Sequence, residues 1–369
     1  IQTAHEVGNE LRAPARRGSA GGSGATAGDE AFWIAVVPFK CAGASPDLTA
    51  LAEGLTEEIV AGLSRFSYLR VLTKGPSGAR YVLEGSLRQA GGQLRVGVKL
   101  IDTSTSANLW AENYTRPYSP EAVFEIQDSL APPIVSTIAE MNGVLAHSMW
   151  VALRDRAPET LTPYEAMLRS FGFYQHLTLD EYQLALTVLK RAIHLAPDHS
   201  GCLAMLAIVY ANGHVLGFGM EEKQADLSVS FARRAVAADS SNHSAHFALA
   251  VAHVVRKDIP AFRSAAERAL ALNSMDGFQM GEIALWTSYS GEWQRGRELM
   301  ERAMALNPRH PGFFWYPLVH DAYRQKDYSR ALDYALRVNL PGQFWTHLVL
   351  AMVNGQLGNR GAAADALRE

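Results

Sequence analysis

The chain has 369 residues, 48% of them hydrophobic and 19% charged, a composition typical of folded domains with sizeable cores. A formal net charge of −3 gives no long-range attraction to nucleic acid or anionic lipid, which argues against a binder of either. No apolar run in the sequence is long enough to span a membrane. The two cysteines, Cys41 and Cys202, lie in apolar contexts, so we expect buried free thiols.

Residues 1–30 are expected to be a flexible linker at the end of a preceding segment. Glycine, serine and alanine dominate residues 18–28, and a glycine-rich backbone loses much entropy on ordering. Since residue 1 is Ile1, we also expect the native N-terminus to lie upstream.

Residues 31–142 are expected to form a small α+β domain. Its predicted strands are 32–39 and 69–73, followed by an antiparallel meander of 81–88, 94–102 and 107–115. A helix from Asp47 buries Leu51, Leu55, Ile59 and Leu63, which recur at intervals of four. A second helix opens at Pro120, and Pro132 and Pro133 should kink it or divide it.

A connecting helix is expected over residues 143–161, and a helical solenoid over residues 162–369. One phrase, of the form Glu301–Pro308, recurs with its last position at 197, 240, 274 and 308, in steps of 43, 34 and 34. A fixed period of 34 residues is typical of stacked helical hairpins. The pattern predicts about five hairpins with a truncated last one, and a loop over 212–220 that accounts for the longer step. The predicted turns are 180–182, 291–293, 326–328 and 358–360.

These hairpins resemble tetratricopeptide repeats, on the residues Gly291, Glu292, Trp293, Gly296, Ala303 and Pro308. The preceding region resembles the TolB-like N-terminal domain, related to the FlgO-type fold, of many bacterial signalling proteins. The phrases that carry this second resemblance are 34–39, 54–59, 63–66, 81–88, 109–112 and 124–128.

The resemblance implies an α+β small sheet domain followed by an all-α tetratricopeptide-repeat solenoid. In that family the pair usually follows a class III adenylate or guanylate cyclase domain, a winged-helix DNA-binding domain or a protein kinase. One departure is that the family places a further strand and helix before the phrase at 81–88. Here only residues 74–80 join the two strands.

Candidate catalytic and metal-binding residues are few, and each has a simpler structural interpretation. The glycine-rich segment 75–80 lacks the Gly-Lys-Ser/Thr of a phosphate loop and predicts a turn. His243, His246 and His253 share roughly one side of a helix, with Asp239 upstream, but no cysteine or further carboxylate completes a metal site, and His243 is expected to precede the helix. We therefore expect no catalytic residue, cofactor or metal in these residues.

The stronger functional candidates lie on the first helix of each hairpin, at the positions that face the concave groove of tetratricopeptide proteins. An aromatic, weakly charged groove suits a partner helix or an extended peptide with apolar anchors. The same spacing is also typical of packing between neighbouring hairpins. The predicted groove residues are Phe247, Val251, Val254, Phe278, Leu285, Phe313, Tyr316, His320, Tyr323 and Trp345.

The leading hypothesis is a non-catalytic protein-interaction and regulatory module of a bacterial signalling protein, coupled to a nucleotide cyclase. It would bind a protein or peptide in the groove, or act on an effector domain of its own chain. Three alternatives stay open: the C-terminal part of a cyclase, the regulatory part of a winged-helix transcription factor, and an envelope scaffold. The expected location is the cytoplasm, or the envelope if a signal peptide precedes Ile1.

Overall fold

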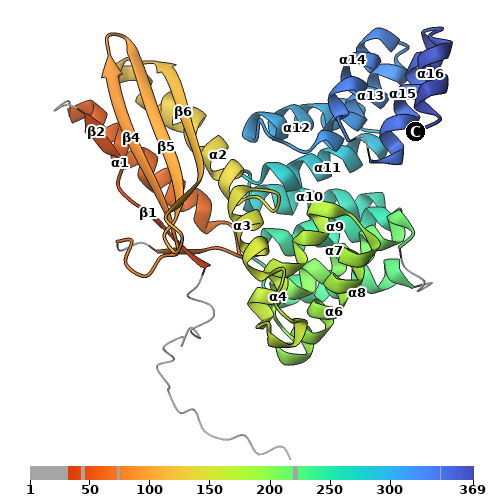
Figure 1. Cartoon of the computed structure of the whole chain (residues 1–369), viewed down its shortest axis with the longest axis horizontal. Coiled ribbons are helices and arrows are strands. Elements are labelled where there is room, and N and C mark those ends of the chain that lie inside the picture. Colours follow the sequence, from red (N-terminus) through yellow and green to blue (C-terminus); the bar gives the residue numbers. More distant parts are fainter. Residues whose placement is uncertain (1–31, 43–45, 73–74, 219–222, 341) are drawn as a thin grey trace, which may run out of the picture.

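The computed structural model describes residues 32–42, 46–72, 75–218, 223–340 and 342–369. The predicted linker over 1–30 lies outside these residues, as does part of the short 74–80 connection. Within the described residues a small mixed sheet with two long helices comes first, and helical hairpins follow (Figure 1). No described helix is both long and apolar enough to cross a membrane.

The sheet has the strand order β3-β1-β4-β5-β6, with β2 beside β4. β1 is parallel to β3 and to β4, whereas β4, β5 and β6 form the predicted antiparallel meander. The strands are β1 (Trp33–Val36), β2 (Lys40–Ala42), β3 (Arg70–Leu72), β4 (Tyr81–Ala90), β5 (Gln93–Asp102) and β6 (Ala107–Pro117).

One face of the sheet packs on helices α1 (Pro46–Ser64) and α2 (Val123–Ala139), which also pack on each other. Successive side chains of a strand point to opposite faces, so burial alternates along β5. Its buried residues are Leu94, Val96, Val98 and Leu100, and Arg95 and Lys99 between them are exposed. The predicted apolar stripe of α1, Leu51, Leu55, Ile59 and Leu63, is fully buried, which confirms that helix.

One prediction for this part of the chain is wrong, and a second is wrong in one of its two alternatives. The run 32–39 is not one strand, because β1 ends at Val36 and a separate strand β2 pairs with β4. Phe39 lies between them and packs over Gly85, where an added Cβ would come within 2.3 Å of its ring. The prolines Pro132 and Pro133 do not divide α2, which runs past both to Ala139. Burial of the neighbouring helical residues against α1 outweighs the lost backbone hydrogen bonds.

After α3 (Val144–Leu153) the described residues form six helical hairpins, the last one with a second helix of only seven residues. The first helix of the first hairpin is broken at Phe171 into α4 and α5. The hairpin helices are α4 (Pro163–Ser170) and α5 (Gly172–His176) with α6 (Leu179–Leu195), α7 (Ser200–Leu216) with α8 (Gln224–Ala238), α9 (His243–Val255) with α10 (Ile259–Leu272), α11 (Gly277–Tyr289) with α12 (Trp293–Leu306), α13 (Trp315–Arg324) with α14 (Tyr328–Val338), and α15 (Phe344–Gln356) with α16 (Arg360–Ala366).

The turn inside each of the last four hairpins has a residue of positive φ at the same repeat position. These residues are Lys257, Gly291, Lys326 and Gly358, with φ of 60°, 98°, 63° and 77°. The predicted turns at 291–293, 326–328 and 358–360 therefore begin at the correct residue. The turn predicted at 180–182 is wrong, because α6 has already begun at Leu179 after the left-handed Leu177.

The loop predicted over 212–220 is also wrong for its first five residues. Helix α7 continues to Leu216 and ends at Gly217, whose left-handed φ of 69° stops it. Helix α7 has 17 residues where α9 and α11 have 13, so about half of the nine extra residues of the 43-residue step lie in the helix and the rest beyond it. Within it, Gly213 lets the ring of Tyr182 approach to a distance that a Cβ would block.

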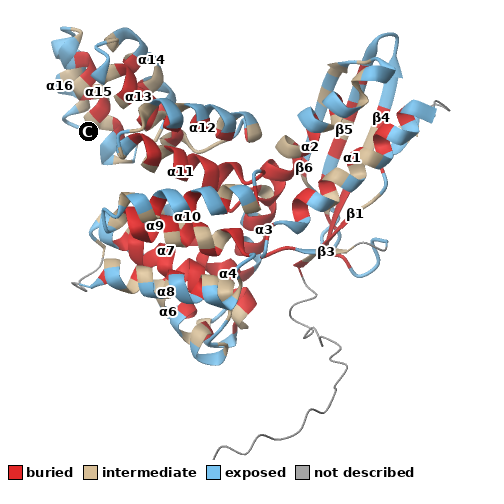
Figure 2. Cartoon of the chain, turned by 180° about the vertical axis from the view of Figure 1, so that it is seen from behind, coloured by how far each residue is buried: buried red, intermediate tan, exposed pale blue. Residues whose placement is uncertain are grey.

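One continuous cluster of buried side chains runs from the sheet through α2 and α3 to α13, and a smaller separate cluster joins α13, α14 and α15. Figure 2 shows the buried residues concentrated on α7, α9 and α11, and exposed ones on the outer strands and the last helices. Both cysteines are free; Cys202 is buried as predicted, but Cys41 is half-buried. The sheet and the first four hairpins thus share one core.

Candidate functional site

The ten predicted groove residues fall on four successive hairpins but differ in burial. Equivalent repeat positions are found by counting back from the positive-φ residue of each turn. Thirteen residues before it lie Phe278, Phe313 and Trp345, and six residues before it lie Val251, Leu285 and His320. Phe247, Val251, Val254 and Phe278 are buried, Leu285, Phe313, Tyr316, His320 and Tyr323 are half-buried, and Trp345 is exposed.

The buried members belong to the core of the first four hairpins. The ring of Phe278 contacts Tyr174 of α5 at 5.3 Å and Phe313 at 6.2 Å between centroids. Tyr174 is held in turn by a hydrogen bond of 3.1 Å from the Asn212 side-chain amide. This part of the predicted groove is filled by the chain's own side chains, so Phe247 and Phe278 are inaccessible to a partner in this conformation.

Three predicted residues on α13, Tyr316, His320 and Tyr323, form a partly exposed surface together with Tyr289 of α11, which was not predicted from the sequence. These four side chains are here called the C-terminal aromatic surface. The hydroxyl of Tyr289 is 2.8 Å from His320 Nδ1, and the Tyr316 hydroxyl is 3.0 Å from Thr346 Oγ1 of α15. Partial burial lowers the pKa of His320 and raises the pKa of Tyr316. The imidazole is therefore neutral near pH 7, and the surface combines rings with hydroxyl and imidazole groups.

Trp345 does not join this surface through any direct contact found among the described residues. It lies on the first turn of α15, 54% exposed, and its ring contacts that of Phe344, which is 69% exposed. Tyr323 contacts Tyr328 on its own hairpin. The structure therefore brings together Tyr289, Tyr316 and His320, and leaves Trp345 as a separate exposed aromatic position.

A second site was not predicted from the sequence, and it joins the sheet to the solenoid. The loop between α1 and β3 and the C-terminal end of α2 contact the turns between hairpins; this junction comprises residues 66–68, 136–141, 242–244, 276–279 and 307. Ser67 Oγ donates to Asn242 Oδ1 at 2.9 Å, and the Tyr68 hydroxyl donates to the Ala139 carbonyl at 2.5 Å. Tyr164 of α4 donates to the Tyr68 carbonyl at 2.7 Å.

Glu140, the residue that follows α2, is buried at the centre of the junction. The Asn307 side-chain amide donates to its Oε1, and Ser136 Oγ donates to its Oε2 at 2.9 Å. The backbone N–H of Gly277, at the start of α11, donates to Ser136 Oγ at 3.2 Å. Burial, reinforced by the neighbouring Asp276 carboxylate, raises the pKa of Glu140 to about 8.

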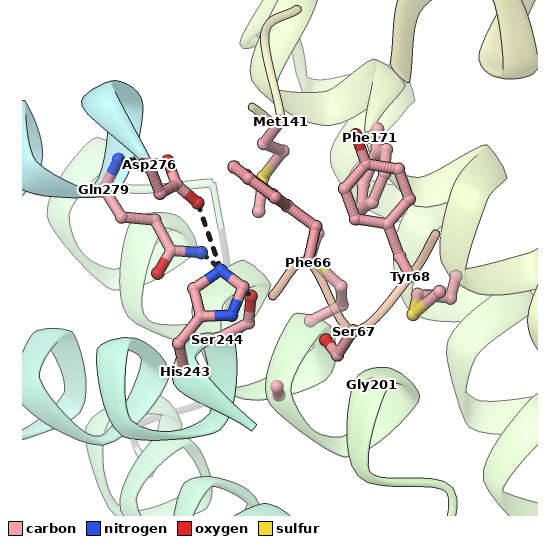
Figure 3. Close-up of a pocket in the computed structure, with 13 residues that line it drawn as sticks. Phe66, Ser67, Tyr68, Met141, Phe171, Gly201, His243, Ser244, Asp276 and Gln279 are labelled. Carbon is pink, nitrogen blue, oxygen red and sulfur yellow. Dashed lines mark hydrogen bonds and ion pairs between the residues drawn. The ribbon is translucent and has the colours of Figure 1, made fainter. Parts of the chain in front are cut away.

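Asp276 joins the two middle hairpins at the same place. Its Oδ1 accepts from the backbone N–H of Gln279 at 2.9 Å and so caps α11, while its Oδ2 lies 3.2 Å from His243 Nε2 (Figure 3). The Gln279 side-chain amide donates to Ser244 Oγ at 2.9 Å. His243 and Asp276 are both buried, so this pair links the first turns of α9 and α11.

A small cavity of about 20 Å³ lies beside this pair. Phe66, Met141 and Phe171 form its apolar wall, opposite the polar groups of His243 and Gln279 (Figure 3). His243 Nδ1 and Gln279 Oε1 are buried and have no hydrogen-bond partner among the described residues. A cavity of this size accommodates one water molecule.

The three histidines that were considered as metal ligands each contact a different partner. His243 pairs with Asp276, His246 Nε2 lies 3.1 Å from the Ser240 carbonyl, and His253 lies 3.7 Å from Asp258. The expectation that His243 precedes the helix is wrong, because it is the first residue of α9. Among the described residues no group of three histidine, cysteine or acidic side chains is placed to bind a metal ion.

One sequence signal could have indicated the junction. Asp239, Asn273 and Asn307 recur at the step of 34 residues, directly after the second helix of a hairpin. Each side chain accepts from the backbone N–H two residues later, at 2.9, 3.1 and 2.9 Å. The repeat therefore presents a row of short polar side chains along one edge, and Asn307 uses its amide to bind Glu140.

No known protein-family model matches the chain. Among curated proteins, "Putative adenylate cyclase 3" of Rhizobium meliloti (strain 1021) is 27% identical, over 59% of this chain and 40% of that protein. The chain thus spans less than half the length of this relative.

Solved structures with a similar course of helices include a tetratricopeptide-repeat protein of Thermus thermophilus, with a TM-score of 0.42 and 16% identity over 53% of this chain and 99% of that one. The human IFIT1 dimer with m7Gppp-AAAA has a TM-score of 0.48 and 15% identity over 61% of this chain and 54% of that one. Similarities this low carry no functional argument, so the site is interpreted from the chain's own geometry.

Proposed function

We propose that this chain is a non-catalytic protein-interaction and regulatory module, which binds a protein or peptide partner on the C-terminal aromatic surface. The observation that carries the proposal is the accessible cluster of Tyr289, Tyr316 and His320 on neighbouring first helices. Aromatic rings with polar tips are the side chains that dominate binding energy at protein interfaces. Stacked hairpins with a 34-residue period commonly present such surfaces to partners.

The proposal extends to a link with cyclic-nucleotide signalling. Its support is the distant relative whose name denotes an adenylate cyclase, together with the resemblance of residues 31–142 to the TolB-like domain. In this proposal, partner binding to the solenoid acts on a nucleotide cyclase through the α+β part. It does so by favouring one of two arrangements of the cyclase domains. The described residues contribute binding and coupling, and the cyclase performs the chemistry.

A capture experiment tests the partner surface. Immobilised native chain and the double variant Tyr289→Ala/Tyr323→Ala would be incubated with a lysate of Rhizobium meliloti, the organism of the relative, and bound proteins quantified by mass spectrometry. The matched control is Phe124→Ala, which removes an aromatic side chain that is 76% exposed but lies on α2. Thermal melts of all three proteins show whether they remain folded.

We expect one or more proteins to bind the native chain and the Phe124→Ala control equally, and the double variant at least about tenfold less. A nucleotide cyclase among them would support the signalling link. Equal capture by all three proteins would contradict the proposed surface. Loss with Phe124→Ala alone would move the partner to the α+β part.

A further inference from the structure

Two carboxyl groups from different parts of the fold, those of Glu140 and Asp276, are buried in the junction. Glu140 has no basic partner among the described residues. Glu140, at the end of α2, is 1% exposed, and its hydrogen bonds come from neutral groups: the Asn307 amide, the Ser136 hydroxyl and the Phe278 backbone. Among the described residues no arginine or lysine forms an ion pair with it. A buried carboxylate bound only by neutral donors is costly, because the donors replace only part of its hydration.

The titratable groups that face Glu140 add no positive charge directly. From α11 the facing group is Asp276, which raises the pKa of Glu140, and from the loop before β3 it is the Tyr68 phenol. His243 of α9 faces Asp276 rather than Glu140. α12 contributes the neutral Asn307 that follows it. An ionised Glu140 would therefore face another acidic group in an interface closed to bulk solvent.

We propose that Glu140 is a pH-sensitive latch between the α+β part and the solenoid: the neutral acid holds the junction closed, and its ionisation favours separation of residues 66–68 and 136–141 from the hairpin turns. The neutral acid fits the site because it keeps its hydrogen bonds without burying a charge. Separation exposes the carboxyl to water, where its charge is hydrated. The latch works independently of any partner on the C-terminal aromatic surface.

The direction and size of the response follow from proton linkage. Glu140 has a pKa of about 8 in the closed junction and returns toward its ordinary value of 4.5 when exposed. The open junction thus binds fewer protons between these values, so raising the pH favours it. From pH 6 to pH 9 the ratio of open to closed molecules should rise by about 100-fold.

Hydrogen exchange followed by mass spectrometry measures this opening in the full chain. Exchange of residues 66–72 and 276–281, corrected for the intrinsic rate at each pH, would be compared for the native chain, Glu140→Gln and Glu282→Gln. Glutamine keeps the shape and the polar character of the Glu140 side chain and cannot ionise. Glu282 is the matched control, since burial raises its pKa to about 7 but it lies on α11 outside the junction.

We expect corrected exchange of both segments to rise steeply with pH in the native chain and in Glu282→Gln, and to stay nearly flat in Glu140→Gln. An equal rise in Glu140→Gln would overturn the proposal. Asp276→Asn gives an independent test, because asparagine still caps α11 while the charge beside Glu140 is lost. Its transition should move to lower pH, and an unmoved transition would also contradict the latch.

Discussion

The fourth and sixth hairpins are built from the same repeating unit, yet they place equivalent residues in opposite environments. Phe278 and Trp345 occupy one repeat position, thirteen residues before the positive-φ turn residue, but Phe278 is 2% exposed and Trp345 is 54% exposed. Around Phe278 the rings of Tyr174 and Phe313 close the concave side, whereas Trp345 contacts only Phe344 among the described aromatic rings.

This difference shows that a repeat position determines the direction of a side chain, while the neighbouring elements decide its exposure. The first four hairpins share a core with the sheet, and their inner positions are used for internal packing. The fifth and sixth hairpins have a smaller core of their own. Positions on their first helices stay partly or largely exposed, and three of the four residues of the C-terminal aromatic surface lie on the fifth hairpin.

The largest expected effect is the difference in stability between variants that truncate Phe278 and Trp345, which occupy equivalent repeat positions. Phe278→Ala should lower the free energy of unfolding by about 3–5 kcal/mol, because it leaves a cavity in the shared core. Trp345→Ala should change it by about 0.5 kcal/mol or less, since most of the side chain is in water. Urea denaturation of both variants measures the difference, and equal losses would show that the two positions are not distinct environments.

A second effect, of intermediate size, is the dependence of folding stability on pH. Burial raises the pKa of Glu282 on α11 from 4.5 to about 7, so the folded chain holds a proton that the unfolded chain has lost. The stabilising contribution of this proton is complete below pH 4.5 and is lost as the pH rises through 7. Glu282→Gln should therefore lose less stability than the native chain between about pH 5 and pH 7, as followed by thermal melts. Parallel curves would contradict the assignment.

The smallest expected effect tests the repeat register itself. Lys326 has a φ of 63° where the equivalent Gly358 has 77°. A side chain costs about 1 kcal/mol in this left-handed region, so Lys326→Gly should stabilise the fold by about 0.5–1 kcal/mol. The reciprocal Gly358→Lys should destabilise it by a similar amount, and denaturant titration compares the two. Changes of the same sign would show that the turns are not equivalent.

The local structure was largely predictable from the sequence. Strand-like runs separated by turn residues located β4, β5 and β6, and the 34-residue phrase placed the turns of the last hairpins within a residue or two. The errors have local causes. The helical pattern of α7 continues through a glycine-bearing stretch, and α2 tolerates Pro132 and Pro133 because its other residues are buried by α1.

The junction could not be predicted in this way, because its contacts join residues that are distant in sequence. Ser67 meets Asn242, Ser136 meets Gly277, and Glu140 meets Asn307 across separations of 175, 141 and 167 residues. Periodicity describes which face of an element is apolar, but not which distant element covers it. The same limit explains why the predicted groove contained both buried and accessible residues.

The central claim is that the α+β part docks on the hairpin turns and leaves the C-terminal aromatic surface open. It can be tested by cross-linking the variant Ser67→Cys/Asn242→Cys with a short thiol-reactive reagent, in a background with Cys41→Ala. The control pair is Ser67→Cys/Tyr289→Cys, and intramolecular products are identified by peptide mass spectrometry. The account predicts efficient cross-linking of the first pair and none of the second. Failure of the first pair in a folded protein, or equal reaction of both, would contradict it.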